Sequence, residues 1–399
     1  MQIKEIISWH IRIPLRAEFV QSGNSATHSD SVIVAIILAD GTTGYGECCP
    51  RAYVTGEDAS TVLAGLAKAR KLLAHTPLHS IETIREFVEE RLSGHLGLAA
   101  TCAIESALLD AFSKYAQAPI TQLLAFDWPE RIRYSGVAPM RPLHKMGPFL
   151  EQLRQFDFKE IKLKIGNCLA DNLATIKLVK QYFGDHIRLR VDANCAWGLR
   201  DAVEQMPALI EAGATVFEQA FPPEKEEELA RATALWGHEA ELMVDESVTT
   251  FQSAERLIRL GIGNRFNLKI SKHGGLFNAL KIAHLANRNG IAFQLGAHYG
   301  ETSMLTACGI IFYALSGQPV AMEGAFGAHL LASDVCKNTL QFGKNACIDA
   351  PAEKMSPLGM GYEVAPELLA QYSPTPYRVY NTLANNKLTP LKQNKNENL

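Results

Sequence analysis

The sequence has no apolar run of the roughly 20 residues that a helix needs to cross a bilayer. The opening residues, MQIKEIISWHIRIPL, alternate between apolar and polar side chains as a strand does. A secretory signal would show a continuous apolar stretch there instead. We therefore expect a cytoplasmic protein with no membrane partner.

An excess of charge of one sign is also missing. The chain has 39 Lys and Arg residues against 42 Asp and Glu residues, a net charge of -3. Such a balance creates no overall field that would attract nucleic acid, so a small molecule is the expected partner. With 399 residues, 47% of them hydrophobic, the chain is long enough for two domains or one large barrel with attachments.

The eight cysteines show no CxxC spacing of the kind that binds zinc or performs redox chemistry. Cys48 and Cys49 are adjacent, which is too constrained for an ordinary disulfide. We expect reduced thiols that are mostly buried. A reactive thiol at Cys48 or Cys49 is the alternative.

The first part of the chain, residues 1–128, is expected to form an α+β unit. The stretch SVIVAIILADGTTGYGE reads as a strand, a turn at Asp40 and Gly41, and a shorter return strand. From Thr55 to about Gln117 the apolar residues recur with helical spacing. An antiparallel sheet followed by helices is the expected order.

Residues 129–345 change to short strands separated by helical stretches. Eight strand candidates occur, RIRYSGVAP, EIKLKIG, IRLRVDAN, TVFEQAF, ELMVDES, RFNLKIS, IAFQLGAH and PVAMEGAF. Eight strands alternating with helices predict a parallel sheet closed as a barrel. A doubly wound open sheet is the alternative, but it usually shows a Gly-rich nucleotide turn after an early strand, and the sequence has none.

The end of the chain is expected to divide in two. Residues 346–380 contain short strand-like pieces such as GMGYEVAP, which we expect to pack back on the first unit. Residues 381–399 are rich in Asn and Lys with few large apolar residues, a composition typical of a disordered tail.

Polar residues at the ends of the barrel strands are the candidates for chemistry, because active sites of such barrels lie there. Asp192, Glu218 and Asp245 end three successive strand candidates. Three carboxylates in one desolvated mouth would repel one another unless a cation neutralised them. Carboxylate oxygens suit a hard divalent ion, so Mg2+ is the first choice and Mn2+ the second.

Lysines flank these carboxylates on both sides. Lys162 and Lys164 belong to the second strand candidate and Lys269 to the sixth, on opposite sides of the predicted mouth. Two bases on opposite faces of a substrate can remove a proton from one face and return it to the other. We expect burial and like charge to lower the pKa of the paired lysines toward the range in which lysine acts as a base.

This set of residues resembles the enolase superfamily, specifically the muconate lactonizing enzyme subgroup of the mandelate racemase/muconate lactonizing enzyme family. The matching motifs are KxK, the three acids, NLKISKHGGL, GYGECCPRAYVTGE and AIESALLDAFSKYAQAP. The resemblance implies a modified TIM barrel, (β/α)7β, with an α+β capping domain completed by the C-terminal segment. It also implies Mg2+ on Asp192, Glu218 and Asp245, with Lys164 and Lys269 as the acid/base pair.

Further residues are assigned supporting roles. The resemblance places Lys272 at a position that is usually basic, and Asn194 and Asn267 are expected to support the metal ligands. Substrate choice is expected to depend on capping loops and on the last two strand ends. The candidates there are Arg51 for a distal carboxylate, His298 as a third acid/base or a structural histidine, and Glu301 and Glu323 for an amino group.

The expected reaction is removal of the proton α to a carboxylate through a metal-stabilised enediolate, catalysed by an isomerase. A racemase or epimerase of an N-acyl amino acid or a dipeptide is the leading interpretation. RAYVTGE resembles dipeptide epimerases, but the chain lacks the DxD that they commonly carry at the eighth strand end. A cycloisomerase or syn-eliminating lyase is the alternative, and a non-catalytic metal-binding scaffold is a third. Family members are often symmetric oligomers, so the resemblance extends that expectation to a homo-oligomer here.

Overall fold

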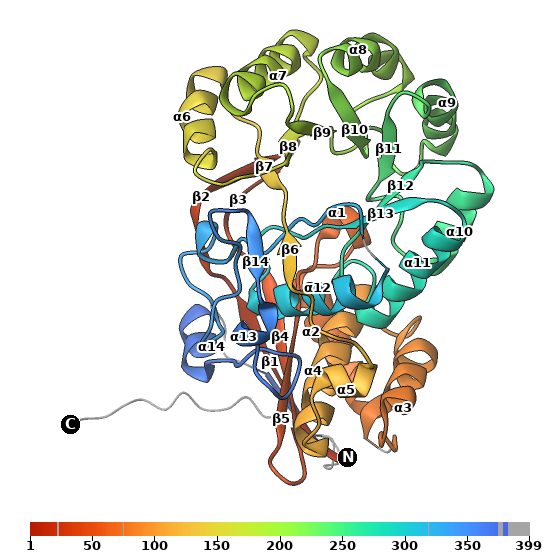
Figure 1. Ribbon diagram of the computed structural model, residues 1–399. Helices are drawn as coiled ribbons and strands as arrows, with labels where there is room; N and C mark the ends of the chain where they lie inside the picture. Colours follow the sequence, from red (N-terminus) through yellow and green to blue (C-terminus); the bar gives the residue numbers. More distant parts are fainter. Residues whose placement is uncertain (22–23, 75, 318, 374–377, 382–399) are drawn as a thin grey trace.

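The two ends of the described chain meet in one antiparallel sheet (Figure 1). The computed structural model describes residues 1–21, 24–74, 76–317, 319–373 and 378–381. The strand order is β15-β1-β4-β5. The bounds are β1 (Ile3–Ile11), β4 (Ser31–Leu38), β5 (Thr43–Cys48) and β15 (Arg378–Asn381). The predicted turn at Asp40 and Gly41 joins β4 to β5, with Gly41 at a φ of 91°.

Helices cover this sheet, and the longest of them touches it most closely. Gly44 and Gly46 on β5 face α4 (Leu98–Ala116). A Cβ atom on Gly44 would lie 2.2 Å from the backbone N of Ala111, and one on Gly46 would lie 2.1 Å from the carbonyl O of Ala103. The GYG pattern therefore permits the alanine-rich helix to approach the strand closely. The other helices of this part are α1 (Ala52–Thr55), α2 (Ala59–Leu73), α3 (Ile81–Glu86), the π-helix η1 (Phe87–Leu92) and α5 (Ile120–Leu124).

The middle of the chain forms a curled parallel sheet with helices around its outside (Figure 1). Within the described residues, this sheet has the order β13-β12-β11-β10-β9-β8-β7, so each strand pairs with the next one in sequence. The strands are β7 (Gly136–Ala138), β8 (Glu160–Lys164), β9 (Arg188–Asp192), β10 (Ala214–Glu218), β11 (Glu241–Val244), β12 (Arg265–Leu268) and β13 (Ala292–Leu295). The helices are α6 (Leu143–Leu153), α7 (Leu169–Phe183), α8 (Leu199–Glu211), α9 (Glu226–Trp236), α10 (Phe251–Arg259), α11 (Leu276–Arg288) and α12 (Ser303–Leu315). The predicted barrel is confirmed, and the open doubly wound sheet is wrong.

A short stretch around Met322 closes the barrel between its first and last strands. Met322 forms a parallel bridge with Leu295. The carbonyl O of Met322 also accepts a hydrogen bond from the backbone N of Ser135, next to β7, at 2.8 Å. The eighth strand candidate, PVAMEGAF, is thus reduced to a bridge. The first candidate, RIRYSGVAP, divides into β6 (Arg131–Arg133) and β7, and only β7 belongs to the barrel.

The C-terminal segment makes two separate returns. β14 (Cys347–Asp349) pairs with β6, and β15 pairs with β1 in the first sheet. Between them lie α13 (Pro351–Lys354) and α14 (Pro366–Tyr372), and the short 3-10 helix η2 (Gly327–His329) precedes β14. The predicted division near residue 128 falls between α5 and β6. The predicted tail, residues 381–399, begins at the last residue of β15, and the rest of it lies outside the described residues.

Two carboxylates of the N-terminal part hold the starts of two barrel helices. Glu47 on β5 accepts hydrogen bonds from the backbone N and the Oγ1 of Thr302, directly before α12. Glu105 on α4 accepts one from the backbone N of Phe277 at 2.9 Å, in the first turn of α11. The exposed N–H groups at a helix start attract an acceptor of this kind. These contacts position the N-terminal part against the barrel.

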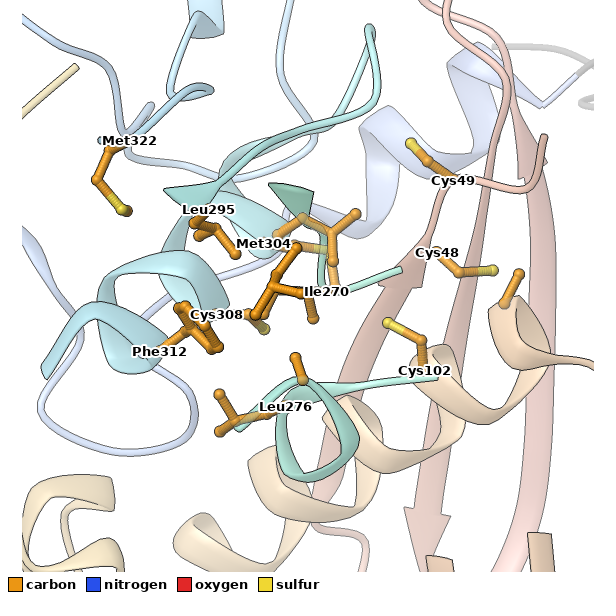
Figure 2. Close-up of a cluster of buried hydrophobic side chains, with 14 of the residues drawn as sticks. Cys48, Cys49, Cys102, Ile270, Leu276, Leu295, Met304, Cys308, Phe312 and Met322 are labelled. Atoms are coloured by element: carbon orange, nitrogen blue, oxygen red, sulfur yellow. The ribbon is translucent and has the colours of Figure 1, made fainter. Parts of the chain in front are cut away.

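Buried apolar side chains continue across the junction of the two parts. Figure 2 shows Cys48, Cys49 and Cys102 on one side, and barrel residues such as Met304 and Cys308 on the other. All eight cysteines are free thiols in the structure. Burial raises the pKa of Cys48 and of Cys49 well above the usual value, which disfavours the reactive thiolate. Six of the eight cysteines are buried, as expected, and their reduced state stays a prediction.

No helix among the described residues is long and apolar enough to span a membrane.

Candidate active site

Alternation along the barrel strands directs charged side chains into the barrel. Residues two apart on one strand share a side, which groups Glu160, Lys162 and Lys164 on β8, and Arg190 and Asp192 on β9. All five are buried. Buried charges are costly unless they are paired, so the partners of each group decide what the site can do.

The three predicted acids lie together at the carboxyl ends of adjacent strands. Asp192 ends β9, Glu218 ends β10 in register with Asp192, and Asp245 directly follows β11. Each is at most 2% exposed. Asn267 donates to Glu218 Oε1 at 2.8 Å and to Asp245 Oδ2 at 3.3 Å, so its amide joins two of them. The structure thus brings together the acids that the sequence placed on separate strands.

The donor chemistry of this cluster fits a hard divalent cation, since three buried carboxylates supply only oxygen ligands. In the described part of the chain, no three acidic, histidine or cysteine side chains converge closely enough to hold a metal ion. Ammonium groups lie among the carboxylates instead, with Lys164 Nζ 2.6 Å from Asp192 and Lys269 Nζ 2.6 Å from Asp245. The carboxylates are therefore neutralised in part by lysines. A divalent ion would supply positive charge of the same kind.

The two lysines of IKLKIG have different partners. Lys164 Nζ donates to Asp192 Oδ2 at 2.6 Å and to Asn194 Oδ1 at 2.7 Å. Lys162 Nζ donates to Glu323 Oε1 at 2.8 Å. Burial lowers the pKa of Lys162, but the carboxylates of Glu218, Glu323 and Asp192 outweigh it and raise the pKa above its usual value. The expected lowering is wrong for Lys162, because acids rather than a second ammonium dominate its surroundings.

Asp245 holds the lysines on the opposite side. Lys269 Nζ contacts Asp245 Oδ2, and Lys272 Nζ donates to Asp245 Oδ1 at 2.6 Å and to the carbonyl O of Asn267 at 2.7 Å. Burial would raise the pKa of Asp245, but Lys269 and Lys272 lower it well below its usual range. Lys272 therefore acts on the site through Asp245 and lies outside the cavity wall.

Arg190 organises a network that sequence reasoning missed. Its guanidinium donates to Glu218 Oε2 at 2.8 Å and to Glu160 Oε1 at 3.1 Å, and lies 2.9 Å from Glu323 Oε2. Burial would raise the pKa of Glu323, but Lys162 and Arg190 lower it to about 2. The alternation of Arg190 with Asp192 in IRLRVDAN was the available signal, since it places both side chains inside the barrel.

A cavity of about 240 Å³ opens above these charges. Lys164 and Lys269 both line it, as do Asn194 and Asp245. Lys164 belongs to β8 and Lys269 follows β12, four strands further along the sheet. A molecule in this cavity would therefore have one lysine on each side.

One wall of the cavity is apolar and aromatic. Phe156 packs against Phe342 with ring centroids 5.3 Å apart, and Phe326 lies 5.8 Å from Phe342. Phe149 and Leu153 of α6 extend the same surface. We call these five residues the aromatic wall. They come from α6, the loop after it, the end of the eighth strand candidate and the segment around Phe342, so no single sequence window contained them.

The β2–β3 hairpin also contributes to the rim of the cavity. Strands β2 (Pro14–Gln21) and β3 (Asn24–His28) pair with each other, and Arg16, Glu18 and Phe19 of β2 line the cavity. The ring of Phe19 stacks on Tyr299 at 5.0 Å. This hairpin is one of the loops of the N-terminal part that reach the cavity, and its effect on substrate choice stays a prediction.

Arg51 lies outside the cavity wall. Its guanidinium donates to the carbonyl oxygens of Asp30, Pro50 and Tyr299, and its Cζ lies 4.1 Å from the centre of the Tyr299 ring. These contacts occupy the group that was expected to bind a distal carboxylate. Arg51 instead braces Tyr299, which does line the cavity.

His298 and the two specificity acids have separate positions. His298 lines the cavity, and its Nδ1 lies 2.9 Å from the carbonyl O of Cys49, which can only accept. Burial lowers the pKa of His298 well below its usual value, so the ring is neutral, with an unprotonated Nε2. Glu301 accepts from the backbone N of His298 at 2.7 Å and lines a smaller neighbouring cavity. Glu323 is already paired with Lys162 and Arg190.

Comparison with known protein families shows which family this chain belongs to. Residues 4–125 match the mandelate racemase / muconate lactonizing enzyme N-terminal domain, and residues 146–368 match the enolase C-terminal domain-like family. The chain belongs to the mandelate racemase / muconate lactonizing enzyme family. This confirms the resemblance read from KxK, the three acids and NLKIS, and it places the chain in the enolase superfamily.

Relatives within the family catalyse several isomerisations. The N-succinyl-L-Arg/Lys racemase of Bacillus cereus is 26% identical over 93% of this chain and 98% of that protein. Muconate cycloisomerase 1 of Acinetobacter baylyi is 28% identical over 85% of this chain and 91% of that protein. A dipeptide epimerase of Cytophaga hutchinsonii was crystallised with Mg and the dipeptide D-Ala-L-Val. Its structure matches this one with a TM-score of 0.82 and 24% sequence identity, over 96% of this chain and 100% of the epimerase chain. The prediction of an isomerase of the enolase superfamily is confirmed at the level of these relatives.

Proposed function

We propose that this protein is a Mg2+-dependent racemase or epimerase that acts on the carbon next to a substrate carboxylate. The observation that carries this proposal is the placement of Lys164 and Lys269 on opposite sides of one cavity, beside the three carboxylates. A substrate between them presents one face of its α-carbon to each lysine. That geometry suits transfer of a proton from one face to the other.

The two lysines need opposite protonation states. A lysine accepts a proton only as the neutral amine, and the lysine that returns a proton must be the ammonium. Lys164 as amine removes the α-proton from one face while Lys269 as ammonium supplies a proton to the other, and the reverse reaction exchanges these roles. Lys162, held by Glu323, contributes a further positive charge beneath the substrate carboxylate.

Asp192, Glu218 and Asp245 are the proposed metal ligands, with Asn267 and Lys272 orienting them. Bound Mg2+ would supply concentrated positive charge for the substrate carboxylate, which becomes more negative as the α-proton leaves. Mn2+ could replace it, since it also prefers oxygen ligands.

An N-acyl amino acid fits the cavity better than a free dipeptide. A dipeptide has an ammonium group, which needs an uncommitted acid close to the α-carbon. Glu323 is paired with Lys162 and Arg190, and Glu301 lines a different cavity. Glu246 does line this cavity, but burial, with Asp245 and Asp192 nearby, raises its pKa to about 7, which disfavours the charged form that an ammonium group needs. Neutral His298 offers Nε2 as an acceptor, which suits an amide N–H. The aromatic wall further favours a substrate with a large apolar group.

The experiment that tests this function follows the α-proton by NMR in deuterated water. The protein is incubated with Mg2+ and panels of N-acyl amino acids, L,L-dipeptides and small lactones, with an EDTA control. We expect metal-dependent loss of the α-proton signal together with inversion, in the N-acyl panel first. Exchange without inversion, or turnover confined to the lactones, would instead support a lyase or the cycloisomerase reaction named for one relative.

A further inference from the structure

Arg141 is a cation in the cavity wall that forms no hydrogen bond or ion pair with the described residues. Arg141 follows β7, and its Cζ lies 4.3 Å from the ring centre of Phe149 in the aromatic wall. Across the described residues, no hydrogen bond or ion pair links its guanidinium to another side chain or to the backbone, and its Nε is buried. Partial burial without a counter-ion lowers the pKa of Arg141 from its usual value, which reflects the cost of holding this charge there.

Arg141 lies in the same cavity as Lys164, one of the two proposed acid/base residues. Arg141 and Lys164 both line the cavity that holds Lys269, and both also line a second, neighbouring cavity of about 320 Å³ beside the start of α7. A group reaching from a substrate next to Lys164 toward the second cavity would therefore meet the Arg141 guanidinium. Stacking on Phe149 holds the guanidinium plane in place, which favours a planar anion such as a carboxylate.

The other charged groups near Arg141 neither bind such an anion nor neutralise the guanidinium. Arg16 lines the same cavity, but its Nε donates to the carbonyl oxygens of Ala328 and Leu331. The acids nearby are Glu18 on the hairpin and Asp171 in the second cavity, and both are exposed. Neither forms an ion pair with Arg141 in the described part of the chain, so the guanidinium is available to a ligand.

We propose that Arg141 binds a second carboxylate of the substrate, so that the preferred substrate is a dianion. One carboxylate lies beside Asp192, Glu218 and Asp245, and the other reaches Arg141. The second carboxylate belongs either to a dicarboxylic acyl group or to an acidic side chain, and the chemistry at Arg141 is the same in both cases. This proposal rests on the proposed function for the position of the first carboxylate.

Unreactive ligands test the proposal without requiring turnover. N-acetyl-2-aminoisobutyrate is a monoanion, whereas N-succinyl-2-aminoisobutyrate and N-acetyl-α-methylglutamate are dianions whose second carboxylate lies on the acyl group or on the side chain. None of the three has an α-proton. Their binding to the full chain in the presence of Mg2+ is measured by calorimetry for wild type, Arg141→Met, Arg141→Lys and a control, Arg200→Met. Arg200 is an exposed residue of α8 that lines neither cavity.

We expect one dianion to bind wild type at least about tenfold more tightly than the monoanion, as a charge-assisted hydrogen bond would provide. Arg141→Met keeps an apolar contact with Phe149 but loses this preference, and Arg141→Lys keeps part of it. Arg200→Met leaves the ratio between the ligands unchanged. The dianion that shows the preference identifies which arm carries the second carboxylate.

Three results would overturn the proposal, namely equal binding of all three ligands, no binding of any of them, and a dianion preference that survives Arg141→Met. A failure of the proposed racemase function would give a different result from a failure of the anion site. If α-proton exchange is absent while the preference depends on Arg141, the anion site stands and the racemase assignment fails.

Discussion

Buried lysines in this barrel owe their behaviour to the groups that face them. Lys162 and Lys164 are two residues apart on one strand, and mutual repulsion was the expected effect. The structure gives each ammonium an acid, Glu323 for Lys162 and Asp192 for Lys164. Opposite charges at close range outweigh burial at Lys162, because the attraction is strong where water is excluded. The pair of lysines is therefore stable inside the barrel.

Asp245 is the carboxylate with the most cationic neighbours, since both Lys269 and Lys272 contact it. We expect Asp245→Asn to weaken Mg2+ binding by about 100-fold or more, because it removes a ligand charge and leaves two ammonium groups beside the site. Calorimetry with Mg2+, or electron paramagnetic resonance with Mn2+, measures the affinity. Asp171→Asn, an exposed substitution outside the cavity that holds Lys164 and Lys269, is the matched control and should bind as wild type does. Equal affinity of Asp245→Asn and wild type would remove Asp245 from the metal site.

The sequence alone predicted most of the proposed reacting groups but few of their partners. Asp192, Glu218, Asp245, Lys164 and Lys269 could be found because each follows or ends an apolar strand. The ion pairs that they form could not be predicted, because these depend on which strands become neighbours and on how far each side chain reaches. The same limit explains why Arg51 was chosen for a distal carboxylate instead of Arg141. Nothing local in the sequence shows that carbonyl oxygens occupy the Arg51 guanidinium.

At the scale of elements, strand and helix periodicity predicted the barrel, whereas its closure followed from long-range pairing. The segment PVAMEGAF reads as a strand, yet it forms only a bridge through Met322 between Leu295 and the start of β7. A short segment is sufficient there because it hydrogen-bonds to both neighbours. The aromatic wall is similarly non-local, since α6 and the segment around Phe342 are nearly 200 residues apart in sequence.

The aromatic wall leads to a prediction about substrate size. Phe156→Ala removes a ring that contacts Phe342 and lines the cavity. Burying a large apolar side chain contributes about 1.5–3 kcal/mol, so the variant should lose about tenfold or more in kcat/KM for N-acyl amino acids with large apolar groups. We expect the loss in KM, and little change for the matching alanine substrate. Initial rates with a phenylalanine and an alanine substrate test this, and Tyr115→Ala on the exposed end of α4 is the control. An equal loss for both substrates would indicate a general structural defect.

At the scale of the whole molecule, the N-terminal part and the barrel act together at the cavity. The hairpin supplies one rim, while Glu47 and Glu105 hold the starts of α12 and α11. A Cβ on Gly275 would lie 1.7 Å from Glu105 Oε2, so this carboxyl is packed directly against the barrel backbone. Sequence could predict two units and a returning C-terminal strand, but not these links, which join residues more than 170 positions apart.

Glu105 leads to a prediction about pH and stability. Burial raises the pKa of Glu105 to about 8, although the backbone N–H groups of Phe277 and Leu276 lower it. The unfolded carboxyl has a pKa of about 4.3, so between these values the folded state holds a proton that the unfolded chain has lost. Stability is therefore favoured at the acid end of this window and falls as the pH rises toward about 8.

Glu105→Gln mimics the protonated carboxyl and should remove this dependence. Near pH 5 we expect wild type and variant to unfold at similar denaturant concentrations. Near pH 8.5 the variant should be more stable by about 1 kcal/mol or more, since each tenfold change in ionisation corresponds to about 1.4 kcal/mol. Chemical denaturation at both pH values gives the difference. A wild type that is more stable than the variant at pH 8.5 would show that the start of α11 favours the charged carboxylate.

The central claim is that Lys164 and Lys269 act on opposite faces of one α-carbon. The measurement that tests it most directly is deuterium incorporation into each enantiomer of a substrate identified in the exchange screen, with the variants Lys164→Met and Lys269→Met. We expect each variant to lose racemisation by about 10³-fold or more while still exchanging the α-proton of one enantiomer, and the two variants to prefer opposite enantiomers. Racemisation that survives in either variant, or the same enantiomer preference in both, would contradict the account.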